Sequence, residues 1–414
     1  MKLASRCTVS LLVLLLIPGY AHAGIQPLAA DDLNPLLAAG KIADAEKAMQ
    51  KRIDTNGKDH PARLGLAFTQ LLGGVEHVTQ SLYHFGFRSR IGIPFIMDFR
   101  LPIGDNPAAQ EVTYEQLRGV LQRAIDDLKR VDETLAKLDD RDVKLPLNFG
   151  LIKLDVNGDG RAADDEAFWK VYAGISGTEL VEPQVAEKFV ITFDAADVEW
   201  LRGYCRLMSA LAEIVLAHDA QDFFDRTGHL WFARPKTPHT FLLARVDWTS
   251  EYAGIMDWIA AIRGFSFNVR EPERMKRALE HIQAMTRHSR AMWKAALAES
   301  DDENEWIPNP KQTGVIPGVR VTDEMVESWK VLLDELDLIL DGKKLIPFWR
   351  NADGQGVNLK RVFTEPRPFD LVYWVQDTGA TPFLDKGEST SEAVWERMQR
   401  VFGGEFIGFA LWFN

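Results

Sequence analysis

Hydrophobic residues recur with a helical period over most of this chain. Between Thr113 and Leu138 they stand three or four positions apart, which is the spacing of one buried face of an α-helix. Asp194, followed by Asp197 three positions later, is typical of the start of another long helix. The same periodicity predicts further helices in 33–70, 247–263, 271–298 and 322–340.

Only two stretches read as extended chain. Residues 143–155 contain Pro146 and Gly150, and residues 188–192 combine β-branched and aromatic side chains. We therefore predict a mainly α-helical fold, with small β elements around the loop that begins at Asp155.

An acidic stretch rich in proline and glycine, residues 301–321, is the best candidate for a linker or a long surface loop. It separates a helical region, 24–300, from a C-terminal helical region, 322–414. We expect both regions to share one core; a division into two domains near 300–320 is the alternative. The apolar tail, 406–413, is too short to span a bilayer and is expected to dock on that core.

The first segment has the features of a secretory signal peptide. Lys2 and Arg6 precede a short apolar run, 11–17, and Ala21-His22-Ala23 offers small residues at a cleavage site. We expect residues 1–23 to be removed before Gly24 and the product to be periplasmic or secreted by a bacterium. No later run is long and apolar enough for a transmembrane segment.

Composition narrows the function classes. The 48 Lys and Arg residues are outnumbered by 60 Asp and Glu residues, so the net charge is -12. This balance argues against a nucleic-acid-binding protein, which needs a basic surface. Cys7 lies in the expected signal peptide, which leaves Cys205 without a disulfide partner; it is expected to be buried and unreactive.

One motif carries specific chemistry. In residues 155–166, Asp155, Asn157 and Asp159 alternate, so a curling loop can turn three side-chain oxygens inward. Gly160 permits a sharp turn, and Glu166 can return two carboxylate oxygens to the same point. Ca²⁺ takes six to eight oxygen ligands, so this residue pattern indicates a calcium site.

The pattern resembles the EF-hand calcium loop. The resemblance implies a backbone ligand at position seven and water at position nine, where Ala163 has no oxygen to offer. No long helix leads into the loop, and Ala162 occupies the position that normally pairs with a partner loop. We therefore expect a single loop with structural calcium, whose implied ligands are Asp155, Asn157, Asp159, Arg161 and Glu166.

Three weaker patterns leave alternatives open. Residues 33–70 weakly resemble a single tetratricopeptide-type hairpin, although two ordinary helices explain them as well. His77 and His84 form a polar stripe with Arg88 and Arg90 that either lines a pocket or faces solvent; His281 and His288 repeat the spacing. Residues 351–356 look like a second ion loop, but Val362 would occupy its twelfth position, which favours a simple turn.

The sequence therefore predicts an exported calcium-binding protein in which the ion is structural, with no catalytic residue assigned. No local motif of a zinc protease, a phosphate-binding loop or a serine hydrolase is present, although a scattered triad would leave no such motif. The alternatives are an envelope hydrolase or solute-binding protein stabilised by calcium, or a helical interaction scaffold.

Overall fold

The computed structural model describes most of the chain from Leu28 onward. The expected signal peptide, 1–23, and residues 351–353 of the glycine-rich turn lie outside the described residues. The described residues are 28–88, 90–93, 97–100, 103–170, 186–244, 250–315, 320–348, 350, 354–403, 406 and 409–410.

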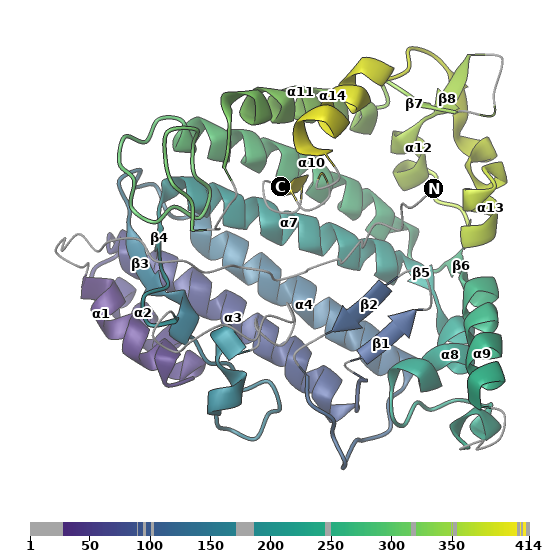
Figure 1. Ribbon diagram of the computed structural model, residues 1–414, viewed down its shortest axis with the longest axis horizontal. Coiled ribbons are helices and arrows are strands. Elements are labelled where there is room, and N and C mark those ends of the chain that lie inside the picture. Colours follow the sequence, from purple (N-terminus) through teal and green to yellow (C-terminus); the bar gives the residue numbers. More distant parts are fainter. Residues whose placement is uncertain are drawn as a thin grey trace.

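Helices make up most of the described structure, as the periodicity predicts (Figure 1). They are α1 (Leu28–Ala38), α2 (Ile42–Thr55), α3 (His60–His84), α4 (Tyr114–Leu135), α7 (Ala195–Ala217), α8 (Gln221–Trp231), α9 (Ser250–Gly264), α10 (Pro272–Ala296), α11 (Asp323–Leu340), α12 (Leu359–Thr364), α13 (Leu371–Val375) and α14 (Glu392–Phe402).

The strands are short and pair antiparallel in small separate sheets, which confirms a mainly α fold with small β elements. The sheet order is β1–β2, β3–β4, β5–β6–β9 and β10–β8–β7. The strands are β1 (Arg90–Ile93), β2 (Met97–Arg100), β3 (Leu145–Asn148), β4 (Val190–Phe193), β5 (His218–Asp219), β6 (Ser266–Val269), β7 (Ile346–Pro347), β8 (Gln355–Val357), β9 (Phe369–Asp370) and β10 (Leu384–Lys386).

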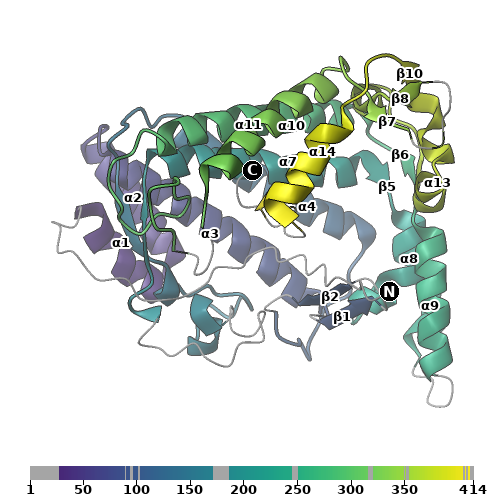
Figure 2. The same ribbon diagram turned by 45° about the horizontal axis from the view of Figure 1, so that its top comes forward.

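The long helices pack side by side in a series, each against the next, in the order α2, α3, α4, α7, α10, α11 and α14 (Figures 1 and 2). One hydrophobic core runs through this series, and its fully buried members include Leu33, Leu64, Leu201 and Trp293. Burial of the apolar stripe of each helix against its neighbour is the main source of stability in such a layered bundle.

Segments from both sides of the 301–321 stretch contribute to that core. Trp306 and Ile307, within the stretch itself, are 6% and 2% exposed and belong to the same cluster as residues of α1 and α7. In the C-terminal tail, Phe406 and Phe409 pack against this cluster, which agrees with the predicted docking of the tail.

The helix starts follow their sequence signals. At α4, the Thr113 hydroxyl accepts a hydrogen bond from the Gln116 amide at 3.2 Å, and the Gln116 side chain accepts one from the Thr113 amide at 2.8 Å. At α7, Asp194 accepts a bond from the Ala196 amide at 2.8 Å, and Asp197 accepts one from the Asp194 amide at 3.1 Å. Each pair satisfies amides that a helix leaves without partners in its first turn.

The helical region that begins at Leu33 contains a break that the periodicity does not show. Gly40 separates α1 from α2 and has a φ of +66°, a conformation that glycine adopts readily and other residues rarely do. The Lys41 amide donates to the Leu36 carbonyl at 2.9 Å and the Gly40 amide donates to the Leu37 carbonyl at 3.0 Å. This pattern is a Schellman motif, which ends a helix by using its last free carbonyls.

Helices α8 and α9 stand beside the sheet β5–β6–β9, where α9 projects from the rest of the molecule (Figure 2). The outward side of α9 exposes apolar residues, among them Met256 and Ile259 at 61% and 55%. Within the part of the chain that the structure describes, every helix is either too short or too polar to cross a bilayer.

Candidate metal centre

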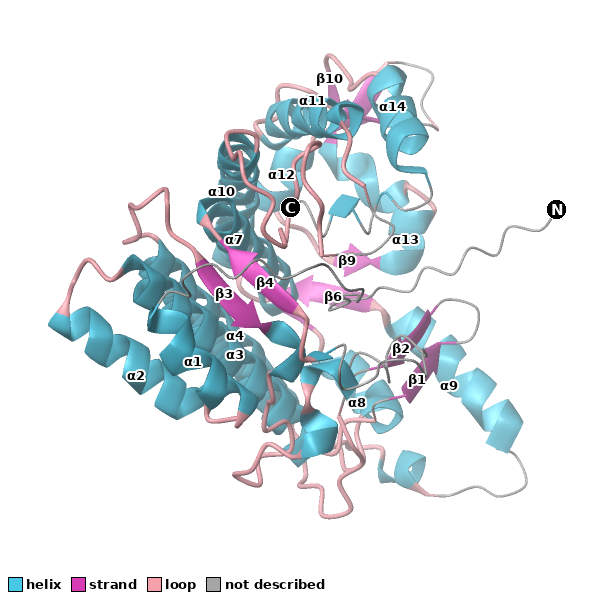
Figure 3. Cartoon of the chain, turned by 60° about the vertical axis from the view of Figure 1, so that its left-hand side comes forward, coloured by secondary structure: helices cyan, strands magenta, loops and turns pink. Residues whose placement is uncertain are grey.

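The predicted ion loop lies between β3 and a helical turn that starts at Phe168. Figure 3 shows β3 beside its partner strand β4. A 3₁₀ turn, Phe149–Leu151, follows β3, so no long helix leads into the loop, as expected. The two ends of the loop are joined by an antiparallel bridge between Lys153 and Ala167, in which the Phe168 amide donates to the Ile152 carbonyl at 2.8 Å. Backbone pairing thus closes the loop where two helices would close an ordinary EF-hand.

Inside the loop, the side-chain oxygens of the expected ligand positions turn onto the loop's own backbone amides. The two carboxylate oxygens of Asp155 accept from Gly158 at 2.7 Å and from Gly160 at 2.9 Å. Both glycines have positive φ angles, 75° and 84°, which lets the chain curl around Asp155.

The next two side chains repeat this arrangement. Asn157 Oδ1 accepts from the Asp159 amide, and Asp159 Oδ1 accepts from the Arg161 amide, each at 2.8 Å. A carboxylate oxygen has more than one lone pair, so an oxygen that accepts an amide hydrogen can also bind a cation. The side-chain oxygens of positions one, three and five are therefore held on one side of a curled backbone.

Glu166 spans the loop from its other end. Its side chain is buried, with the residue 7% exposed, and its carboxylate oxygens accept from the Val156 amide at 3.1 Å and the Ala163 amide at 2.7 Å. Burial raises the pKa of Glu166, and the charges of Asp155 and Asp159 raise it further. The negative charges of the two other carboxylates of the expected ligand set therefore act on Glu166.

Helix α3 contributes two residues that sequence reasoning did not connect with the loop. Glu76 accepts a hydrogen bond from the Asp155 amide at 2.9 Å, and Gln80 Nε2 donates to the Asp155 carbonyl at 2.7 Å. They lie one helical turn apart and fix both backbone polar groups of the first ligand residue. Burial raises the pKa of Glu76 to about 7, with the charges of Asp155 and Glu166 adding to that effect.

The turn between α1 and α2 packs directly on the loop. A Cβ at Gly40 would lie 2.1 Å from the Cβ of Ala162, so the two chains are in close contact. Ala162 is the position at which an EF-hand loop normally pairs with a second loop. In this chain the α1–α2 turn contacts Ala162, and this contact supports the loop.

Asp164 lies outside the loop interior. Its side chain is 84% exposed and forms an ion pair with Lys153 at 2.6 Å, which lowers the pKa of Asp164. Position ten of the loop therefore points outward, and this residue provides a control for the charge of Glu166.

The carboxylate oxygens of the loop lie farther apart than those of a second acidic group. Among the described residues, the three carboxylates whose oxygens come within 4.8 Å of one another are Asp194, Glu299 and Glu305, not those of the loop. The oxygens of Asp155 and Glu166 accept from backbone amides, whereas those of Asp159 accept from the Arg161 amide and, at 3.5 Å, from the Asn157 side chain. A cation bound in the loop would have to draw these three carboxylates closer together.

The predicted histidine stripe does not form a common site. His77 bonds to Asp127 of α4 at 2.8 Å, whereas the ring of His84 lies against that of Phe85, with centroids 5.5 Å apart. The second pair also divides, since His288 bonds to Glu199 at 2.7 Å and His281 faces Arg206. His77, His281 and His288 therefore each contact a different residue on a neighbouring helix, and His84 contacts the residue that follows it in the chain.

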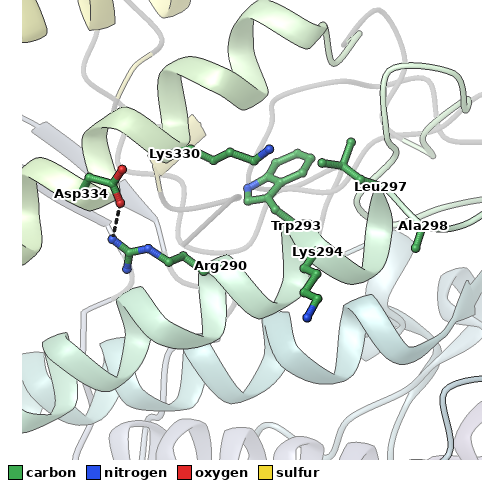
Figure 4. A pocket seen from close by; sticks show the side chains of 7 residues that line it. All are labelled: Arg290, Trp293, Lys294, Leu297, Ala298, Lys330 and Asp334. Atoms are coloured by element: carbon green, nitrogen blue, oxygen red, sulfur yellow. Dashed lines mark hydrogen bonds and ion pairs between the residues drawn. The ribbon is translucent and has the colours of Figure 1, made fainter.

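A pocket of about 500 Å³ lies between α10 and α11 (Figure 4). None of these four histidines is among the residues that line it. Arg290 points across it to Asp334, with which it forms a hydrogen bond at 3.0 Å, and Lys330 pairs with Glu327 at 3.0 Å. These two cationic groups are therefore already compensated by carboxylates. The lining residues are Arg290, Trp293, Lys294, Leu297, Ala298, Lys330 and Asp334.

Helices α2 and α3 form the predicted helical hairpin, with Asp59 capping α3 by accepting from the Ala62 amide at 3.0 Å. The resemblance of this hairpin to a tetratricopeptide unit, like that of the loop to an EF-hand, stays a prediction. No family model, curated protein or solved structure matches the chain.

Proposed function

We propose that residues 155–166 bind one calcium ion and that the ion stabilises the fold of a protein exported from a bacterial cell. The observation that supports this proposal best is the curled loop, in which Asp155 accepts from both Gly158 and Gly160. That arrangement collects oxygen atoms around one point of the backbone, and hard cations such as Ca²⁺ prefer oxygen ligands.

The charge distribution around the loop supports a cation as the ligand. Asp155, Asp159 and Glu166 belong to the loop, and Glu76 adds a fourth carboxylate from α3. The charges of Asp155 and Glu166 raise the pKa of Glu76, because like charges that lie close together disfavour ionisation. A divalent cation would relieve this repulsion, and the ligands proposed for it are Asp155, Asn157, Asp159, Arg161 and Glu166.

A structural role follows from what the loop touches. Gln80 and Glu76 link it to α3, and Ala162 links it to the α1–α2 turn. An ion that stiffens the loop would therefore hold the N-terminal helices against the segment that follows β3. If the dissociation constant is about 0.1 mM, as at the tighter end of extracellular calcium modules, roughly 1 mM calcium adds about 1.4 kcal/mol to the free energy of unfolding.

Calorimetric titration with Ca²⁺ of wild-type protein and two charge-matched variants tests the proposal. Glu166→Gln removes a buried carboxylate of the proposed ligand set, and Asp164→Asn removes an exposed one two positions away. We expect Glu166→Gln to weaken calcium binding at this loop at least tenfold and Asp164→Asn to change it by less than twofold.

The calcium affinities of the two variants, compared with each other, test the proposed ligand register. Equal effects on calcium affinity would mean that only the overall negative charge of the segment matters, and the proposed ligand register would be wrong. Far-ultraviolet circular dichroism of both variants checks that the helices are intact. A wild-type protein whose melting temperature is the same in calcium and in a chelator would contradict the structural role.

A further inference from the structure

A separate group of carboxylates meets at the N-terminus of α7. Asp194 caps this helix, while Glu299 and Glu305 come from the segment that follows α10. One oxygen from each of these three residues lies within 4.8 Å of the others. Asp194 and Glu305 are 8% and 4% exposed, so two of the three charges are removed from water.

Each carboxylate of this group is anchored by a hydrogen bond to the surrounding protein. Asp194 Oδ1 accepts from the Ala196 amide at 2.8 Å, and Glu305 Oε1 accepts from the Glu303 amide at 2.9 Å. Glu299 Oε2 accepts from the side chain of Gln312 at 3.3 Å. These bonds fix the direction of all three groups without neutralising any of them.

Asp194 and Glu299 each place a carboxylate oxygen within 4.8 Å of the other, and Glu305 completes the group at the same spacing. Ionised carboxylates offer only lone pairs, so they cannot bond to each other directly. A shared proton or a bound cation would relieve the repulsion among the three groups.

Asp197 provides a second, independent observation that favours a ligand at this group. The residue is 3% exposed; its Oδ2 atom accepts from the Asp194 amide at 3.1 Å, and its Oδ1 atom is buried without a hydrogen-bond partner. Burial raises the pKa of Asp197, and the nearby charges of Asp194, Glu305 and Glu299 raise it further, so this carboxyl group lies close to the other three. A buried oxygen without a partner is costly, and a bound cation would satisfy it.

The nearby basic residue does not provide this compensation. Lys144 forms its ion pairs with Asp301 and with Glu303, the latter at 2.9 Å, and both of these carboxylates are more exposed than Glu305. Its positive charge reaches Glu305 only through space. Lys144 therefore pairs with the two more exposed carboxylates and not with the buried Glu305.

We propose that Asp194, Glu299 and Glu305 bind a hard divalent cation, with Asp197 Oδ1 facing the same ion. Calcium–oxygen distances of 2.3–2.6 Å place opposite ligands of one ion about 4.6–5.2 Å apart, so three oxygens within 4.8 Å fit a single coordination shell. Carboxylate ligands select Ca²⁺, Mg²⁺ or Mn²⁺ over softer metals. The ion would tie the start of α7 to the segment that follows α10.

The competing explanation is that the carboxyl groups share protons and remain uncharged. Calorimetric titrations of the exported protein with Ca²⁺, Mg²⁺ and Mn²⁺, each alone after chelator treatment, separate the two. Glu299→Gln keeps the size of the side chain and removes one ligand charge, and Glu303→Gln removes a neighbouring exposed charge as the matched control. For at least one of the three cations, we expect Glu299→Gln to bind one ion fewer than wild type and Glu303→Gln to bind the same number.

A second variant distinguishes the loss of a ligand from misfolding of Glu299→Gln. Asp194→Asn should remove the same ion and keep the helix cap, because asparagine caps helices about as well as aspartate. Unchanged numbers and affinities of bound ions in both variants would overturn the inference in favour of shared protons.

The titrations test the proposed site at α7 and the proposed loop site at 155–166 independently. If Glu299→Gln loses an ion that Glu166→Gln retains, the result supports the site at α7 whether or not the loop binds calcium. If wild-type protein binds a single ion that only Glu166→Gln removes, the loop binds calcium and the α7 site does not exist. Protein that binds none of the three cations overturns both proposals.

Discussion

Replacement of Gly40 by alanine tests whether the α1–α2 turn supports the ion loop. Gly40 has a φ of +66°, and a Cβ added there would lie 2.1 Å from the Cβ of Ala162. The substitution therefore introduces two separate costs. One is the strain of a left-handed backbone in a residue other than glycine, and the other is a steric overlap with the loop.

Each cost has a typical magnitude. The left-handed conformation costs a residue with a Cβ about 1–2 kcal/mol. Insertion of a methyl group into a closely packed contact costs about 1–3 kcal/mol, because the neighbouring chain has to move. Gly40→Ala should thus lower the free energy of unfolding by about 2–5 kcal/mol.

A double-mutant cycle with Ala162→Gly separates the two costs. Without the Ala162 Cβ, the nearest atoms to an added methyl group are the Ala162 Cα at 3.4 Å and the Lys153 Cβ at 3.5 Å, which are ordinary contacts. In that background Gly40→Ala should cost only the backbone strain, about 1–2 kcal/mol. The difference between the two backgrounds is the interaction energy of the contact.

Urea denaturation followed by tryptophan fluorescence measures these free energies. For a chain of this length, an unfolding entropy near 2 cal/mol/K per residue makes 2–5 kcal/mol correspond to a fall of about 2–6 °C in melting temperature. Gly57→Ala is the control, because Gly57 lies in the turn between α2 and α3 and a Cβ there has no neighbour within 4 Å. It should leave stability nearly unchanged.

The reasoning is refuted if Gly40→Ala costs the same in the wild-type and Ala162→Gly backgrounds, since the contact with the loop would then contribute nothing. A Gly40→Ala variant as stable as Gly57→Ala would also refute the backbone argument. If the loop binds calcium, the Gly40→Ala variant should in addition need a higher calcium concentration to reach half-saturation.

Three further predictions concern other parts of the chain. Mass spectrometry of the exported protein should find Gly24 as its first residue; an intact N-terminus would contradict the signal-peptide interpretation. Burial, and then the charge of Arg206, lower the pKa of His281 below 6.5, so the unfolded chain binds protons more readily and stability should fall as pH drops below about 6.5. His281→Gln should reduce that fall in urea titrations at pH 7 and pH 5, and an identical fall would refute this assignment. Cys205 is 2% exposed and burial raises the pKa of its thiol, so a thiol reagent should label Cys205 only when the protein unfolds.

Local features of the sequence were sufficient to predict most helices and the residues that begin them. The apolar spacing in 113–138 corresponds to α4, and Asp194 with Asp197 forms the predicted cap of α7. A cap of the same kind, made by Thr113 and Gln116, begins α4. These features depend on neighbours within one or two turns, so they can be read from the order of residues alone. The break at Gly40 had a local signal as well, a glycine after an apolar helical run, and the periodicity concealed it.

The sequence also defined the candidate ion loop, because its ligand positions lie within a few residues of one another. It could not show that Glu76 and Gln80 hold Asp155, that the α1–α2 turn packs on Ala162, or that His77 bonds to Asp127.

The carboxylate group at α7 depends on tertiary structure in the same way. Asp194 and Glu299 belong to distant parts of the chain, and the acidic stretch after α10 reads by itself as a solvated loop. Such contacts are decided by which faces of α3, α4, α7 and α10 bury their apolar residues against each other. The packing of those faces sets the positions of the polar groups at the helix ends, and only the folded chain determines it.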